Sequence, residues 1–125
     1  MALSNSDRVE IAELLSRYGL LMDRQRTEEW MDLFVNDAAL DIEGRPLLSS
    51  ADDRLDLAHT APHGTHLSAP PVISEGALPE TARTEQAFIF RNRAEGSFLG
   101  GWYEDDLVKA DGRWRFQRRT IRFHQ

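Results

Sequence analysis

The chain has 125 residues and a net charge of −6 at neutral pH, a length that suits one globular domain over residues 1–125. Hydrophobic residues make up 41% of it, enough for a packed core. The lack of cysteine excludes disulfides, thiolate metal sites and a cysteine nucleophile. The acidic balance argues against nucleic-acid and anionic-membrane partners, which need clustered Lys and Arg. Because no long apolar stretch suggests a signal peptide or membrane span, we expect a cytoplasmic protein.

The first half of the chain predicts helices. Apolar side chains recur at three- and four-residue spacing along the first of them, which is typical of an amphipathic helix lying on a core. Serine residues stand where N-caps are needed, and Pro62 with Gly64 ends the last helix. The predicted elements are helices over residues 6–23, 27–36 and 49–61 and a short strand over 38–42.

The second half predicts β-strands. The pair Asp111-Gly112 is typical of a type I′ hairpin turn, which needs positive φ at both positions. The pair Gly100-Gly101, inside a strand, predicts a bend or a bulge. The order of elements indicates an α+β domain in which helices cover one face of a curved antiparallel sheet, with a ligand pocket at its open end. The predicted strands cover residues 65–75, 81–94, 98–109 and 113–123.

Three of the four histidines lie within eight residues, at 59, 63 and 66. Their spacing could suit zinc, but Pro62 and Gly64 interrupt the helix and no acidic residue stands among them, so we expect no metal. His59 and His63 are interpreted as solvent-facing residues at a helix end. Alternation along the strand that His66 opens can turn its side chain inward. There it would be either a hydrogen-bonded rim histidine or a general base.

A general base needs a carboxylate, and Asp23 at the end of the first helix is the candidate. The alternative is an aspartate that binds nearby backbone N–H groups. Tyr18 is either a pocket residue or a core tyrosine with its hydroxyl satisfied, since spacing alone does not place it beside Asp23. If no bulge interrupts the last strand, Arg118 and Arg122 share one face, either toward the pocket or on an exposed edge. Neither a G-x-S-x-G elbow nor a Gly-rich nucleotide motif is present.

Five segments together resemble the SnoaL-like branch of the nuclear-transport-factor-2-like superfamily, and they extend over nearly the whole chain. The resemblance implies a cone-shaped, curved, mostly antiparallel sheet packed against three N-terminal helices and enclosing a pocket. The segments are residues 8–18 with Asp23, then 30–38, 66–73, 100–107 and 112–116.

The resemblance also implies site residues. In members similar to scytalone dehydratase, bile-acid dehydratase and hexachlorocyclohexane dehydrochlorinase, an Asp after the first helix and a His opening a strand form a catalytic dyad. Asp23 and His66 stand at those two places, and Tyr18 is similar to the pocket tyrosine of the bile-acid enzyme.

We therefore expect a cofactor-independent, dehydratase-type lyase that acts on a small, cyclic, hydrophobic hydroxy compound of aromatic or terpenoid type. His66 would remove a proton, Asp23 would stabilise the imidazolium, and Tyr18 would hydrogen-bond the departing oxygen. The alternatives are an isomerase or cyclase with the same dyad, or a structural subunit resembling the small subunit of aromatic-ring dioxygenases. We expect a homo-oligomer, with a dimer favoured, because Phe88, Phe90 and Trp102 are predicted to leave apolar area on the outer sheet face.

Overall fold

The computed structural model describes residues 2–124. Within them the chain forms helices first and strands later, as the sequence predicts. The helices are α1 (Asn5–Asp23), α2 (Thr27–Met31) and α3 (Ala51–Thr60), and the strands are β1 (Phe34–Ile42), β2 (Gly64–Ser68), β3 (Val72–Glu75), β4 (Thr81–Asn92), β5 (Phe98–Ala110) and β6 (Arg113–Phe123). None of the described helices is long and apolar enough to cross a membrane.

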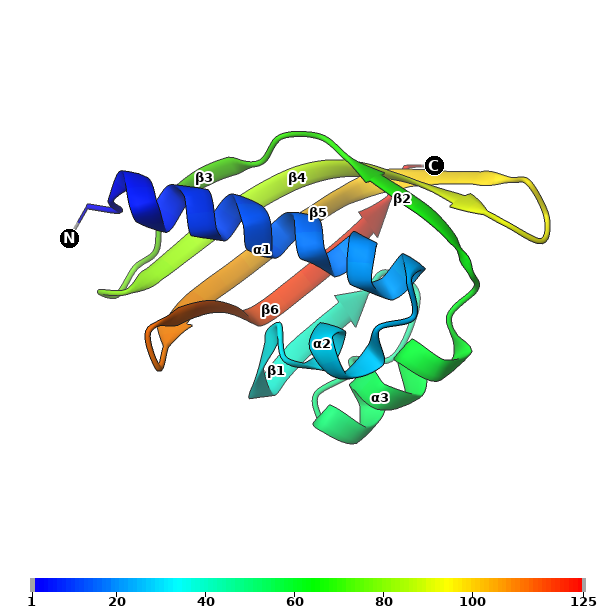
Figure 1. Ribbon diagram of the computed structural model, residues 1–125, viewed down its shortest axis with the longest axis horizontal. Helices are drawn as coiled ribbons and strands as arrows, with labels where there is room; N and C mark the ends of the chain where they lie inside the picture. The colour runs from blue at the N-terminus through cyan, green and yellow to red at the C-terminus, as the bar shows by residue number, and fades with distance from the viewer. Residues whose placement is uncertain (1, 125) are drawn as a thin grey trace.

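The strands form one curved, mixed sheet in the order β1-β6-β5-β4-β2, and β3 also pairs with β4. The β1–β6 pair is parallel and the others are antiparallel. Helix α1 runs across one face of the sheet, while α2 and α3 lie near the end of β1 (Figure 1). This arrangement confirms the predicted α+β fold class. We call the sheet face that α1 covers the inner face and the opposite one the outer face.

Serine caps begin the two longer helices. Ser4 accepts a hydrogen bond from the Asp7 N–H, and the Asp7 carboxylate accepts one from the Ser4 N–H, which makes a capping box. The Ser50 side chain accepts from the Asp53 N–H at the start of α3. These local bonds fix where α1 begins, and so where its other end lies against the sheet.

The predicted second helix is too long. It ends at Met31, and the residues from Phe34 onward extend into β1 instead of reaching Asn36 in helical form. Strand pairing with β6 is more favourable here than the helix that the spacing predicts. The Phe116 N–H donates to the Leu33 oxygen, and Phe34 packs in the core.

The predicted strand over residues 65–75 is two strands. Residues 69–71 include two prolines, which lack the N–H that a ladder needs, so the pairing stops there. Both pieces pair with β4, and His66 of β2 lies opposite Phe90 while Ile73 of β3 lies opposite Thr84.

The core lies between α1 and the inner face, and it includes Phe88 and Phe90. These two side chains are 6% and 8% exposed, so their predicted position on the outer face is wrong. Alternation along β4 turns its even-numbered residues inward, and of the three aromatic residues only Trp102 belongs to the outer face. That face instead carries the ion pairs Arg83–Asp106, Arg118–Asp41 and Arg122–Glu104.

A bulge interrupts β6 at Gln117. Leu107 pairs with Phe116 and Asp106 with Arg118, which leaves Gln117 without a partner on β5. Residues beyond the bulge therefore change face, and Arg119 points inward in place of Arg118.

The two predicted glycine features differ in outcome. Asp111 and Gly112 have φ of 53° and 75°, which confirms positive φ at both turn positions. Gly100 and Gly101 mark no bulge, since the β4–β5 register runs through them. A Cβ on Gly101 would collide with the backbone oxygen of Arg122, so close strand approach requires glycine there.

Candidate active site

Asp23 and His66 form a hydrogen-bonded pair between the end of α1 and β2. Asp23 Oδ1 lies 2.6 Å from His66 Nδ1, and Asp23 Oδ2 accepts a hydrogen bond of 2.6 Å from the His66 backbone N–H. The side chains are 16% and 14% exposed, respectively. Because the carboxylate accepts from both groups, it orients the ring and places a proton on Nδ1. Nε2 is then the nitrogen that carries a free lone pair.

The end of α1 explains why Asp23 reaches across to β2. Helix α1 ends at Asp23, where the Arg24 N–H still bonds the Leu20 oxygen, and Gln25 has φ of 56°. The chain turns away there, so the last carboxylate of the helix projects toward His66 instead of capping its own backbone. Asp23 therefore does not bind the backbone N–H groups next to it in the chain, which was the alternative expected for it.

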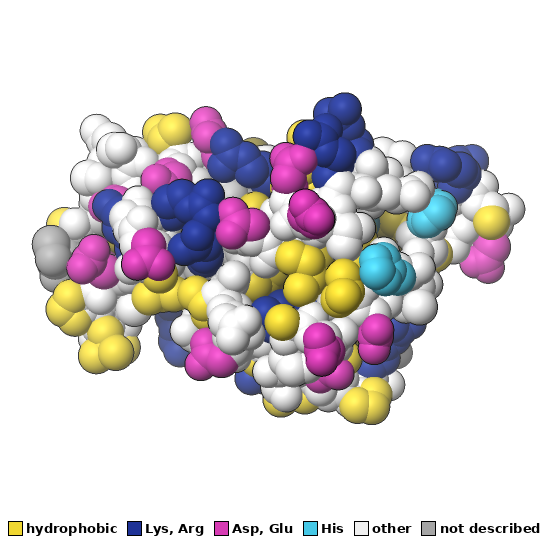
Figure 2. Space-filling model, turned by 60° about the horizontal axis from the view of Figure 1, so that its bottom comes forward, with side chains coloured by type: hydrophobic (Ala, Val, Ile, Leu, Met, Phe, Trp, Pro, Cys, Tyr) yellow, Lys and Arg dark blue, Asp and Glu magenta, His cyan; other side chains and the backbone are white. Residues whose placement is uncertain are grey.

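A cavity of about 300 Å³ opens beside His66. Most of its wall is apolar or aromatic, which keeps the polar groups in it few and well defined. Figure 2 shows hydrophobic side chains gathered near histidines on the face that carries α2 and α3. The lining residues are Tyr18, Met22, Ile42, Arg45, Leu57, Ala61, Pro62, His66, Phe88, Phe90, Leu99, Tyr103, Ile121 and Phe123.

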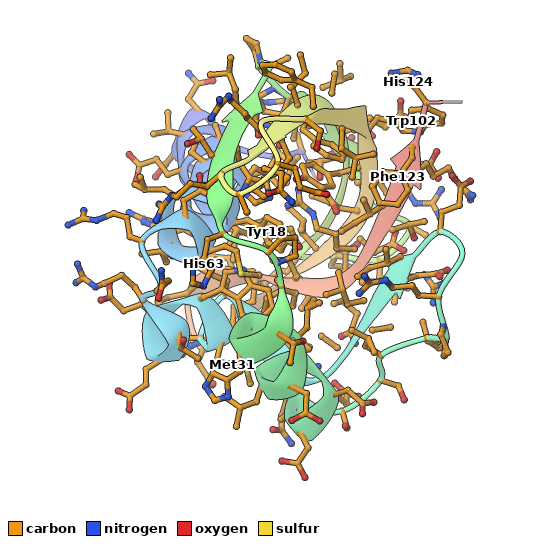
Figure 3. All side chains as sticks on the ribbon, turned by 90° about the vertical axis from the view of Figure 1, so that its right-hand side faces the viewer. Tyr18, Met31, His63, Trp102, Phe123 and His124 are labelled. Atoms are coloured by element: carbon orange, nitrogen blue, oxygen red, sulfur yellow. The ribbon has the colours of Figure 1, made fainter. Side chains whose placement is uncertain are left out.

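Two tyrosines line the cavity. Tyr18 points into the space between the helices and the sheet (Figure 3), and its ring meets that of His66 edge-on, with centroids 6.2 Å apart. Tyr103 lies 5.6 Å from Tyr18, centroid to centroid, and stacks on Phe88. Burial raises the pKa of Tyr18 to about 12, against the opposing effect of the Arg119 cation. Burial also raises the pKa of Tyr103. Both hydroxyls therefore stay protonated at neutral pH and can donate hydrogen bonds.

The guanidinium of Arg119 packs against the rings of both tyrosines. It is fully buried and makes a two-point ion pair with Asp105, at 2.8 Å and 3.0 Å. Thr84 donates a further hydrogen bond to Asp105. The guanidinium carbon lies 3.6 Å from the centre of the Tyr103 ring and 4.3 Å from that of Tyr18. Burial opposes the charge, but the Asp105 carboxylate outweighs it and the pKa of Arg119 is raised.

Sequence reasoning missed both Arg119 and Tyr103. Arg118 and Arg122, the arginines that simple alternation favours, bind Asp41 and Glu104 outside the cavity. No sequence pattern indicates the bulge at Gln117. This bulge turns Arg119 toward the interior and leaves Arg118 and Arg122 on the outer face. Alternation along β5 sets Tyr103 on the face opposite Trp102, but it does not tell which of the two faces lines the cavity.

The other two clustered histidines lie apart from the dyad. His59 and His63 are exposed, and His63 Nδ1 is 3.4 Å from Gln25 Nε2. Over residues 2–124, no group of three or more His, Asp or Glu side chains is placed to hold a metal ion.

The model of the SnoaL-like domain matches residues 4–120. The chain belongs to the SnoaL-like family. No curated protein sequence matches it. Solved structures similar to this SnoaL-like chain include three, each below 25% identical to it, that differ in what they do. A candidate scytalone dehydratase from Novosphingobium aromaticivorans is 24% identical, with a TM-score of 0.81 over 96% of this chain and 85% of that one.

Two further structures share the fold. The β subunit of a candidate aromatic-ring-hydroxylating dioxygenase from the same organism is 23% identical, with a TM-score of 0.79 over 96% of this chain and 90% of that one. A hexachlorocyclohexane dehydrochlorinase is 16% identical, with a TM-score of 0.82 over 96% and 86%. At these identities the likeness establishes the fold, and the chemistry must be argued from the site.

Proposed function

We propose that this protein is a cofactor-independent lyase that dehydrates a small, cyclic, hydrophobic hydroxy compound. The observation that carries the proposal is the Asp23–His66 pair in the wall of an apolar cavity. A histidine whose Nδ1–H is held by a carboxylate is oriented as a base, because its Nε2 is free and its protonated form is stabilised. A histidine that served packing alone would not need a carboxylate oxygen on its Nδ1.

In the proposed reaction Nε2 of His66 removes a proton from a carbon next to the one that carries the hydroxyl group. The electrons of the broken C–H bond form the new double bond as the C–O bond breaks. Tyr18 donates a hydrogen bond to the departing oxygen, and Tyr103 offers a second hydroxyl in the same cavity. The oxygen takes up the proton held by His66 and leaves as water, so the site returns to its starting charge.

The environment of the dyad favours such a step. Asp23 and His66 are mostly buried beside apolar walls, and the lower local dielectric strengthens the interaction of Asp23 with the imidazolium as charge develops. The raised tyrosine pKa values keep two neutral donors available without adding a competing negative charge. Proton abstraction without loss of a group would give an isomerase or cyclase, and the same residues would serve it.

A structural subunit is the second candidate, because a dioxygenase β subunit shares the fold. The open cavity with a hydrogen-bonded dyad supports the enzyme instead, since a purely structural core would gain stability by filling that volume with side chains.

A panel of cyclic hydroxy compounds with a carbonyl next to the acidic C–H distinguishes these functions. Elimination creates a conjugated double bond, which ultraviolet absorbance detects, and mass spectrometry detects the loss of water. We expect turnover by the wild-type protein, roughly 100-fold slower turnover by His66→Gln, and full turnover by the matched control His63→Ala. Equal turnover by wild type and His66→Gln would overturn the proposal.

The assembly we propose is a homodimer through the outer sheet face. No helix within residues 2–124 covers that face, where Ile89 is 48% exposed and Trp102 is partly exposed. Light scattering should give about twice the 14.3 kDa chain mass, and Ile89→Glu should halve it. A wild-type mass of one chain at high concentration contradicts the dimer.

A further inference from the structure

Among the residues that the structure describes, Arg45 is the one permanently charged side chain that lines the cavity. It follows β1 and is exposed, so it stands at the cavity mouth. Apart from His66, the remaining lining side chains are apolar or aromatic, and they bring no second ionised group at neutral pH.

The backbone that carries Arg45 is held at several points. The Arg45 N–H donates to the Ile42 oxygen at 3.0 Å, which closes a tight turn, and Gly44 within it has φ of 83°, where glycine is favoured. A pair of hydrogen bonds between Leu40 and Leu48 closes the loop behind this turn. Arg45 therefore projects from a preorganised loop, which lowers the entropy cost of binding a ligand there.

The carboxylates near Arg45 in the chain are occupied elsewhere. Glu43 accepts a hydrogen bond from the Phe123 N–H at 3.1 Å, and Asp41 accepts one from Arg118 at 2.7 Å. Within residues 2–124, the guanidinium of Arg45 has neither an ion pair nor a side-chain hydrogen bond. The acidic residues nearest to Arg45 in the chain therefore leave its guanidinium free to bind a ligand.

Arg45 and His66 lie at opposite edges of the sheet. Arg45 follows β1 and His66 belongs to β2, with β6, β5 and β4 between them, and the cavity extends from one to the other. We propose that Arg45 binds a carboxylate on the substrate, at the end of the cavity opposite the dyad. This inference rests on the proposed function, because it names the class of compound that His66 would act on: a cyclic hydroxy acid.

A carboxylate is the group that suits this arrangement. The planar guanidinium presents two parallel N–H donors that match two carboxylate oxygens. The chain's net charge of −6 repels anions at long range, so a preference for an anionic ligand requires a local cation such as Arg45.

The test is calorimetric titration with two probes that share a ring system, 2-naphthoate and 2-naphthalenemethanol. We expect wild type to bind the carboxylate about tenfold more tightly than the alcohol, the usual scale for a charged hydrogen bond. Arg45→Met should remove this preference and leave the affinity for the alcohol unchanged. Arg91→Met makes the same charge change at an exposed position outside the cavity lining, and it should keep the preference.

The variant His66→Gln separates this inference from the proposed function. If it keeps the preference, the carboxylate does not bind at the dyad, and the result holds whether or not any compound is turned over. If His66→Gln abolishes the preference and Arg45→Met does not, the inference is wrong. Equal binding of the two probes by wild type, or no binding of 2-naphthoate at millimolar concentration, overturns it as well.

Discussion

A Cβ on Gly19 would stand 2.7 Å from the Cβ of His66. Helix α1 and strand β2 therefore approach so closely at the dyad that only a glycine leaves room for the histidine. Gly19 lies one helical turn before Asp23, so the residue that gives space to the imidazole and the residue that orients it share one face of α1.

Gly19→Ala should damage the site in spite of the helix propensity that it adds. In an unconstrained helix this change stabilises by up to about 1 kcal/mol. Here it pushes His66 away, and we expect a loss of unfolding free energy in urea together with a changed His66 imidazole signal by NMR. Ser16→Ala, at an exposed position in the same helix, is the control that should keep or slightly raise the unfolding free energy and leave the His66 signal unchanged. A more stable Gly19→Ala protein with an undisturbed His66 signal would contradict this.

His66→Gln and Asp23→Asn should each lower kcat on a substrate from the panel, the first by roughly 100-fold, the scale of a lost general base. Because the two residues act as a unit, the double variant should lose much less than the product of the single losses. His59→Ala and His63→Ala should keep wild-type kcat. Multiplicative losses in the double variant would mean that the two residues act independently.

The two tyrosines predict an alkaline loss of stability. Tyr18 and Tyr103 are the chain's two tyrosines, and both have raised pKa values when folded. Above pH 10 the unfolded chain releases phenol protons that the folded chain keeps. The contribution of each tyrosine to the free energy of unfolding should therefore be constant below pH 10 and fall by about 1.4 kcal/mol per pH unit above it, for Tyr18 up to about pH 12.

Ultraviolet titration of tyrosinate checks this directly, because Trp does not ionise. Absorbance should stay flat past pH 10 in the folded protein and rise with unfolding, and Tyr18→Phe should reduce the pH slope of stability. A normal titration near pH 10 without unfolding would show that the hydroxyls are accessible to water.

Adjacent aspartates on β5 offer a matched comparison of ion pairs. Asp105 pairs with Arg119 where both side chains are fully buried, and Asp106 pairs with Arg83 on the outer face, where they are 47% and 70% exposed. Arg119→Met leaves a buried unpaired carboxylate and should cost about 3–5 kcal/mol of unfolding free energy in urea.

Arg83→Met should cost less than about 1 kcal/mol, because solvent already screens that pair. Combining Arg119→Met with Asp105→Leu should recover much of the stability, since no charge is then left buried. Equal effects of the two arginine substitutions would refute the distinction.

The sequence predicted what depends on local patterns. The periodicity of α1, the serine caps and the Asp111-Gly112 turn each follow from interactions within a few residues. The pairing of Asp23 with His66 joins positions 43 residues apart in the chain; the residues alone made Asp23 a candidate with an alternative left open, and the resemblance to the family favoured the pair. Their catalytic role stays a prediction.

What the sequence could not predict depends on strand pairing. Phe34 has the spacing of a helix residue, but hydrogen bonds to β6 make it part of β1. The direction of Phe88 and Phe90 depends on which face α1 covers, and either face is compatible with alternation. Arg119 depends on a bulge that only the register with β5 reveals.

The unpaired Gln117 reverses the alternation of inward and outward side chains along β6. Every residue after it in β6 has the opposite side from the one that strict alternation from Trp114 would give it. If Gln117 were paired in regular register, with no residue lost, Arg118 and Arg122 would turn inward and Ile121 and Phe123 would leave the cavity wall. The largely apolar lining would then become cationic without a single substitution, so the bulged register between β5 and β6 decides which molecules the cavity admits.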